Sequence, residues 1–130
     1  MGKEESRCEE RVVIIGCGRA GSSLAGLLKK HSVPVLGAAD TDRTKAEKMV
    51  RENRADRVIS GPEAIPPHTT LIFLAVQDRC IEAAAAVVSA EGSRFSGKTV
   101  MAHLSGAKPA SVMDSGTGFP GQLCSFHPCM

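Results

Sequence analysis

The chain has 130 residues, 16 of them Lys or Arg and 14 Asp or Glu, which gives a net charge of +2. This length predicts one domain, and so small a charge excludes the strongly basic surface of a nucleic-acid-binding protein. Residues 1–10 read as a charged leader without the apolar stretch of a secretory signal, and no apolar run reaches the ~18 residues of a membrane helix. We therefore expect neither a nucleic acid nor a membrane as a partner.

Five cysteines, an odd number without a CxxC pair, favour a reducing compartment and hence the cytoplasm. Cys124, His127 and Cys129 lie close together in the sequence, but three ligands at this spacing match no zinc pattern. The sequence therefore predicts no metal site.

Short continuous apolar runs alternate along the chain with segments of helical spacing. The runs predict strands buried on both faces at 12–15, 33–39, 57–59, 71–76, 99–104 and 123–126. The segments between them predict helices at 22–30, 45–51 and 79–90, the last with Asp78 as N-cap. Pro109 suits the first turn of a further short helix that ends near Asp114.

Strands that alternate with helices in this way are typical of a parallel sheet with right-handed crossovers. The chain is therefore predicted to be α/β, a doubly wound Rossmann fold in three layers, with strand order 3-2-1-4-5-6. One such domain would occupy residues 11–130.

A GxGxxG motif follows the first predicted strand directly and leads into the first helix. It comprises Gly16, Cys17, Gly18, Arg19, Ala20 and Gly21, and the second strand ends in Asp40, 19 residues after Gly21. This context is the one a dinucleotide-binding loop requires. Gly16 would permit the tight turn, Gly18 would leave room for the pyrophosphate, and Gly21 would let the helix pack closely.

Two alternatives to this interpretation remain open. The glycines could serve only a tight strand-to-helix turn. A methyltransferase-type loop is the second, but it has a tighter GxGxG spacing and an acidic residue before the first glycine, where this chain has Ile15. Cys17 has two interpretations as well: a packing residue, or a thiol whose pKa is lowered by the helix N-terminus.

The end of the second strand bears on the choice between NAD and NADP. The Asp40 carboxylate can accept hydrogen bonds from the adenosine ribose and would repel a 2′-phosphate, which favours NAD. Arg43, or with less reason Arg19 or Lys45, could pair with that phosphate instead. The alternative is that these cations are only solvated charge at a helix start.

Two more loops follow strands at the edge where open α/β sheets bind ligands. Ala75, Val76 and Gln77 follow the fourth strand, and Ser105 lies just after the fifth. We expect them near the nicotinamide half of a cofactor, together with His127. No catalytic residue is identified, and His103 and Ser105 are the candidates. The alternative for His103 is a histidine whose ring is satisfied by backbone groups.

Four segments together resemble the N-terminal domain of a bacterial family of Rossmann-like, NAD(P)-binding oxidoreductases that carry a C-terminal helical domain of unknown function. They are the glycine loop, LIFLAVQDRCI at 71–81, HLSGA at 103–107 and SFHP at 125–128. The family is similar to deazaflavin-dependent NADP oxidoreductases, pyrroline-5-carboxylate reductase and the 6-phosphogluconate dehydrogenase group. Two positions depart from the family: Gln77 stands where Pro is common, and Asp40 to Arg43 replace a Ser-Arg type of ending suited to NADP.

The resemblance implies hydride transfer between a nicotinamide cofactor, NAD or NADP, and a small carbonyl, imine or alcohol. Because the chain stops at Met130, after the sixth predicted strand, we expect the substrate and dimerisation domain to be absent and the isolated chain to be inactive. A homodimer is a further expected partner. The alternative function is a non-catalytic module that binds a nucleotide or a partner.

Overall fold

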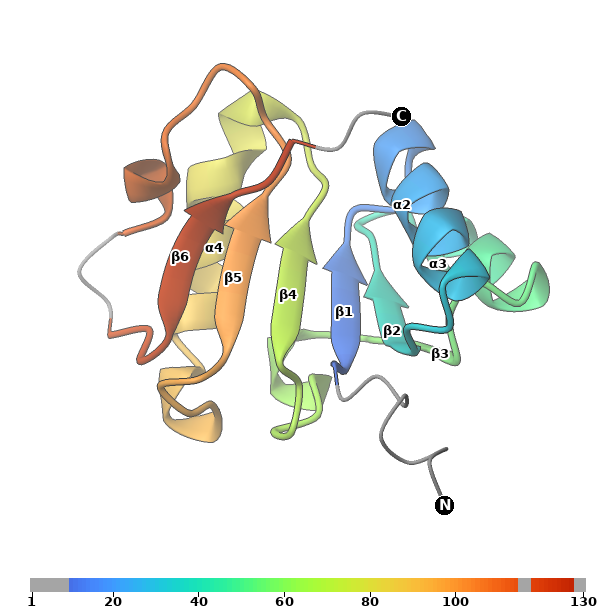
Figure 1. The fold of residues 1–130 in the computed structure, drawn as a ribbon, viewed down its shortest axis with the longest axis horizontal. Helices are drawn as coiled ribbons and strands as arrows, with labels where there is room; N and C mark the ends of the chain where they lie inside the picture. Colours follow the sequence, from blue (N-terminus) through green and yellow to red (C-terminus); the bar gives the residue numbers. More distant parts are fainter. Residues whose placement is uncertain (1–9, 115–117, 128–130) are drawn as a thin grey trace.

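The structure, a computed structural model, describes residues 10–114 and 118–127 (Figure 1). Its strands are β1 (Val12–Ile15), β2 (Val35–Ala39), β3 (Arg57–Val58), β4 (Leu71–Leu74), β5 (Val100–His103) and β6 (Gln122–Ser125). Its helices are α2 (Arg19–Lys30), α3 (Arg43–Arg51) and α4 (Ile81–Ser89). Short 3-10 turns are η1 (Pro62–Ala64), η2 (Asp78–Cys80), η3 (Gly92–Arg94) and η4 (Ala110–Met113).

All six strands join one parallel sheet in the order β3-β2-β1-β4-β5-β6, which confirms the predicted doubly wound fold. The strand arrows point the same way in Figure 1, so their carboxyl ends share one edge of the sheet. The strand order reverses between β1 and β4, where Ile14 lies beside Phe73. Ligands bind at this switch point in open α/β sheets.

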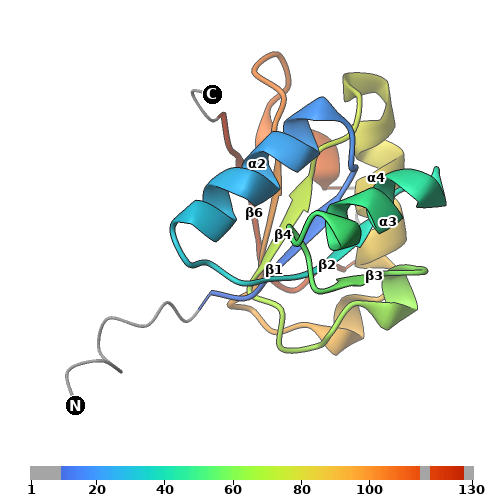
Figure 2. The ribbon, with the colours of Figure 1, turned by 90° about the vertical axis from the view of Figure 1, so that its right-hand side faces the viewer.

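The sheet separates two apolar cores. Leu24 of α2 and Met49 of α3 pack with Ile14 on one face, while Ile81 of α4 packs with Val13 on the other. Figure 2 shows α2 and α4 on opposite sides of the sheet. Val12, Val13 and Ile14 are fully buried because helices cover both faces of β1. These layers are the three that the sequence predicts.

Several local predictions need correction. Asp78 is not the N-cap of α4: it is the first residue of the 3-10 turn η2, and Cys80 occupies the N-cap position of α4. The tighter turn starts there because the chain must bend sharply from the end of β4 into α4. Pro109 precedes η4 rather than lying within its first turn. β2 begins after Pro34, and β6 begins and ends one residue earlier than predicted.

No helix among the described residues is both long and apolar enough to cross a membrane. Residues 1–9, which make up nearly all of the predicted leader, and Cys129 lie outside the described residues.

Candidate functional site

The glycine loop turns sharply out of β1 at Gly16, which has a φ of +106°. A Cβ on Gly16 would fall on the carbonyl oxygen of Ala75, and a Cβ on Gly21 would fall on the carbonyl oxygen of Gly16. A side chain at Gly16 would push the loop away from the end of β4, and a side chain at Gly21 would push α2 away from the loop. The expected roles of these two glycines, a tight turn and a close helix approach, are confirmed.

Gly18 differs from its neighbours because it faces open space. No atom lies within 4 Å of the position that its Cβ would occupy. Gly18 is the N-cap of α2, has no side chain to cap the helix, and precedes a first turn without an acidic residue. The positive end of the helix and its unpaired N–H groups therefore remain available for an anion such as a phosphate.

The Asp40 carboxylate lies beside the glycine loop and is held by two backbone groups. Its Oδ2 accepts a hydrogen bond from the N–H of Cys17 at 2.7 Å, and its Oδ1 accepts one from the N–H of Asp42 at 2.8 Å. A carboxylate offers about four acceptor sites, so about two remain for hydroxyl groups of a ligand. Asp40 thus positions the loop and can also bind a ligand.

Cys17 is a packing residue and not a reactive thiol. Its side chain is buried, and Sγ donates a hydrogen bond to the carbonyl of Ala39 at 3.4 Å. Burial, and secondarily the negative charge of Asp40, raises the pKa of the Cys17 thiol to about 12. The helix N-terminus therefore does not lower this pKa below its ordinary value.

A cleft of about 770 Å³ opens at the carboxyl edge, beside the glycine loop. Its polar side comprises Gly16, Gly18, Asp40, Thr41, Lys45 and Gln77. Its apolar side comprises Ile59, Pro62, Ile65, Val76, Ala84 and Val87. One polar rim beside one apolar wall suits a ligand with both a charged and a flat apolar part.

The cations near Asp40 differ in what they face. Lys45 lines the cleft. Arg43 begins α3 but forms an exposed ion pair with Glu47 at 3.1 Å, and neither Arg43 nor Arg19 lines the cleft. Of the three basic candidates, Lys45 is therefore the one placed to meet a phosphate in the cleft.

The predicted residues after β4 and β5 separate into two groups. Ala75, Val76 and Gln77 line the cleft, whereas His103 and Ser105 do not. His103 is fully buried: its Nδ1 accepts from the N–H of Ser105 at 3.1 Å, so its Nε2 carries the proton that it donates to the carbonyl of Pro109 at 3.0 Å. The geometry supports the alternative of a histidine satisfied by the backbone. Ser105 is buried too, and its Oγ accepts from the N–H of Ala107.

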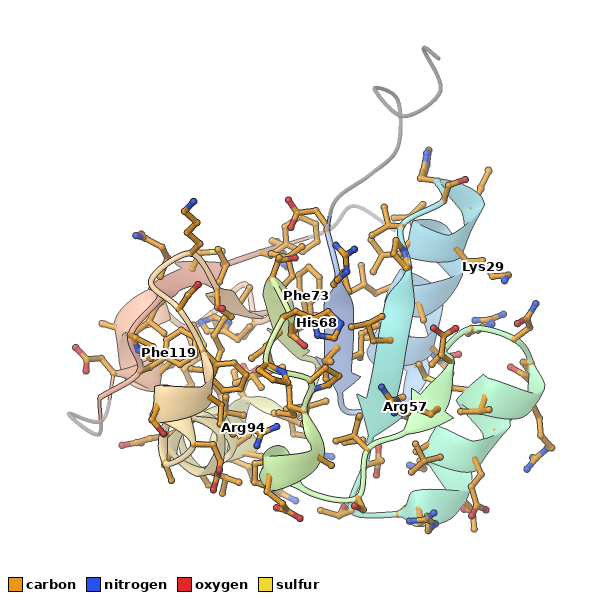
Figure 3. The ribbon with its side chains drawn as sticks, turned by 90° about the horizontal axis from the view of Figure 1, so that it is seen from below. Lys29, Arg57, His68, Phe73, Arg94 and Phe119 are labelled. Atoms are coloured by element: carbon orange, nitrogen blue, oxygen red, sulfur yellow. The ribbon has the colours of Figure 1, made fainter. Side chains whose placement is uncertain are left out.

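His127 lies at the exposed carboxyl end of β6, and half-buried Cys124 packs on the α2 face of the sheet. Within residues 10–114 and 118–127, no three His, Cys, Asp or Glu side chains form a group that could hold a metal ion. A second cleft, of about 620 Å³, lies at the amino edge beside Lys29, which is labelled in Figure 3. It contains none of the predicted site residues.

Sequence reasoning missed the apolar wall of the cleft, in particular Ile59 and Val87. Val87 is 52% exposed although it is a large apolar residue. The signal was present in the segment IEAAAAVVS, which forms α4 and carries apolar residues on its outward side as well as toward the core. A helix of this composition indicates that a second apolar contact covers part of its exposed face.

The Rossmann-like domain model matches residues 3–123, and the chain belongs to this family. Solved structures share the fold. A protein from Bacteroides fragilis assigned as an NADP oxidoreductase has 16% identity over 92% of this chain and 44% of its own, with a TM-score of 0.76. Prephenate dehydrogenase from A. aeolicus, in complex with hydroxyphenyl propionate and NAD+, has 15% identity over 88% and 40%, with a TM-score of 0.72.

An imine reductase from Bacillus cereus has 21% identity over 88% of this chain and 39% of its own, with a TM-score of 0.64. The chain thus spans less than half the length of these structures. No curated protein sequence matches it significantly. The family match and these neighbours agree with the resemblance that the sequence motifs indicate: the chain has the fold of the nucleotide-binding domain of such oxidoreductases.

Proposed function

We propose that this domain binds a nicotinamide dinucleotide in the cleft at the carboxyl edge. The open space at Gly18 carries the proposal, because it lies at the uncapped N-terminus of α2, where a pyrophosphate would meet N–H donors and no Cβ. The residues present fit such a cofactor. Gly16, Gly18 and Gly21 would shape its phosphate site, Asp40 would accept from the adenosine ribose, and the apolar wall around Val87 would cover the adenine.

NAD is the cofactor that Asp40 favours, since its carboxylate would lie close to a 2′-phosphate and repel it. Lys45 opposes this preference because it lines the same cleft and its positive charge would attract a 2′-phosphate. We place the nicotinamide half toward Ala75, Val76 and Gln77, at the switch point between β1 and β4.

We propose that the whole protein is an oxidoreductase that acts on a small carbonyl, imine or alcohol. The bound cofactor supplies or accepts the hydride, and the chain's own residues hold and orient it. The described residues enclose only one side of the nicotinamide position, and excluding water there requires a second wall. We therefore expect this chain alone to give negligible turnover, to be checked by screening small imines, 2-oxo acids and aldehydes against the reduced cofactor.

The proposed compartment is the cytoplasm. The described cysteines Cys17, Cys80 and Cys124 are all free thiols, which suits a reducing environment.

The test of the binding site is calorimetric titration of NAD and NADP into a Gly18→Val variant. The branched side chain would enter open space in the free protein, so the fold is retained, but it would meet the pyrophosphate. We expect affinity to fall at least tenfold, or about 1.4 kcal/mol. Gly97→Val is the matched control: Gly97 is exposed before β5, where the nearest atom to a Cβ is 3.7 Å away. Unchanged affinity in a folded Gly18→Val variant would remove the pyrophosphate assignment.

A further inference from the structure

The helices α2 and α3 both begin at the carboxyl edge of the sheet, because α2 follows β1 and α3 follows β2 (Figure 1). Their first turns differ in charge. α2 begins after Gly18, with no side-chain cap and no acidic residue, so its N-terminus is open to a phosphate. α3 begins after Asp42, whose carboxylate caps the helix. Of these two N-termini, that of α3 is therefore already occupied by an anion of the chain itself.

The Asp42 residue engages the donors in the first turn of α3. Its Oδ1 accepts hydrogen bonds from the N–H of Thr44 at 3.1 Å and from Thr44 Oγ1 at 2.5 Å. The N–H of Lys45 donates to the carbonyl oxygen of Asp42 at 3.0 Å. A hydroxyl and two N–H groups that could hold a phosphate at this helix start are thus bonded to Asp42.

Asp42 also lies next to the carboxylate to which we assign the adenosine ribose. The N–H of Asp42 donates to Oδ1 of Asp40 at 2.8 Å, while Oδ2 of Asp40 binds the glycine loop. A 2′-phosphate is bonded directly to this ribose, so it would lie beside the start of α3. It would meet two carboxylates there instead of one.

The two cations of this segment are already engaged. Arg43 forms an ion pair within α3. Two hydrogen bonds from Thr44, and to a lesser extent the positive charge of Lys45, hold the pKa of the Asp42 carboxyl below its usual range. The charge of Lys45 is thus partly offset by Asp42. Residues 40–47 carry three carboxylates against two cations, a balance that disfavours a further phosphate.

We propose that Asp42 is a second specificity-determining residue, whose carboxylate takes the position of a 2′-phosphate at the start of α3 and selects NAD over NADP together with Asp40. The inference rests on the proposed dinucleotide site and adds a second charge to its discrimination between the two cofactors. Removing the Asp40 carboxylate alone would then leave part of the barrier to NADP in place.

Two substitutions separate the charge of Asp42 from its capping role. Serine caps a helix about as well as aspartate, so Asp42→Ser removes the charge and keeps the cap. Asp42→Gly removes the charge and also frees both donors of Thr44, at a small loss of stability. Calorimetric titration, with displacement of NAD where NADP binds weakly, should show that Asp42→Ser raises the ratio of NADP to NAD affinity about threefold or more. Asp42→Gly should raise this ratio further.

Asp56→Ser is the matched control, because it removes the same formal charge from an exposed residue that lines the cleft at the opposite, amino edge. Its ratio of affinities should stay within about twofold of wild type. Denaturant unfolding verifies that each variant is folded. Added salt should reduce the effect of Asp42→Ser, since exposed charges are screened, whereas a merely structural effect would not respond in this way.

An unchanged ratio in a folded Asp42→Ser variant, or an equal rise in Asp56→Ser, would overturn the inference and leave the proposed binding site intact. Failure of the wild-type chain to bind either dinucleotide would instead overturn the proposed function, and this inference with it.

Discussion

The imidazole of His127 packs directly on Gly106: a Cβ on residue 106 would lie 2.7 Å from both Cε1 and Nε2 of the ring. The glycine of the HLSGA segment and the late histidine are thus parts of one structural feature at the ends of β5 and β6. Phe126 ties the same two strands together, because its N–H donates to the carbonyl of His103. Two of the segments that carry the family resemblance are therefore in contact in the structure.

Asp40→Ser should change both cofactor preference and stability. Loss of the carboxylate removes repulsion of a 2′-phosphate, so NADP binding should improve relative to NAD. The backbone N–H groups of Cys17 and Asp42 also lose their charged acceptor. Stability should fall by about 2 kcal/mol, as measured by denaturant unfolding. If the affinity ratio measured by calorimetry stayed at the wild-type value, Asp40 would not face the ribose.

Lys45→Ala and Arg43→Ala are a matched pair of variants that tests which of the two side chains contacts the 2′-phosphate of NADP. Lys45 lines the cleft, whereas Arg43 is paired with Glu47. Lys45→Ala should weaken NADP binding several-fold with little effect on NAD, since the lost contact is made to the phosphate. Arg43→Ala should leave both affinities within about twofold. The reverse result would assign the phosphate contact to Arg43.

His103→Leu should reduce stability and leave dinucleotide affinity intact. The substitution strands the Ser105 N–H and the Pro109 carbonyl without their side-chain partner in a buried position. The expected loss is about 2 kcal/mol by chemical denaturation. A large fall in affinity with unchanged stability would instead return His103 to the binding site.

Cys17 should resist alkylation by iodoacetamide at pH 8, while exposed Cys80 reacts. The Cys17 side chain is buried, and this burial raises the pKa of its thiol from 9.0 to about 12. The reactive thiolate is therefore scarce at pH 8. The stabilisation linked to this shift is complete below pH 9 and is lost as the pH rises toward 12. Mass spectrometry of tryptic peptides distinguishes the two sites. Equal labelling of Cys17 and Cys80 in the folded protein would contradict the burial of Cys17.

The strand order could be predicted because continuous apolar runs and GxGxxG are both local patterns in the sequence. Together they are typical of one topology, the doubly wound parallel sheet. The structural roles of Gly16 and Gly21 were predictable for the same reason. Their steric requirements depend on the strand-to-helix turn, which is formed by residues that are neighbours in the sequence. Element ends were less accurate. At Asp78 a residue typical of an N-cap lies in a 3-10 turn, because the path from β4 into α4 overrides its capping preference.

The cleft was only partly predictable because its walls come from segments distant in sequence. Whether Arg43 or Lys45 enters it depends on the rotation of α3 and on Glu47, one turn later. The burial of His103 depends on Pro109 returning over β5. The apolar wall at Ile59 and Val87 forms only when the chain after β3 meets α4. No pattern of neighbouring residues in the sequence indicates any of these contacts.

The double engagement of Asp40 constrains how this domain could evolve. A replacement at residue 40 that admits a different dinucleotide also loosens the connection between the end of β2 and the phosphate loop. A lineage that changes its cofactor would first need a higher free energy of unfolding, or a new hydrogen-bond acceptor for the Cys17 N–H from another segment. With the cofactor role proposed for Asp40, selectivity and foldability would be inherited together at this position, and laboratory selection for NADP should recover compensating substitutions near β2 along with any change at Asp40.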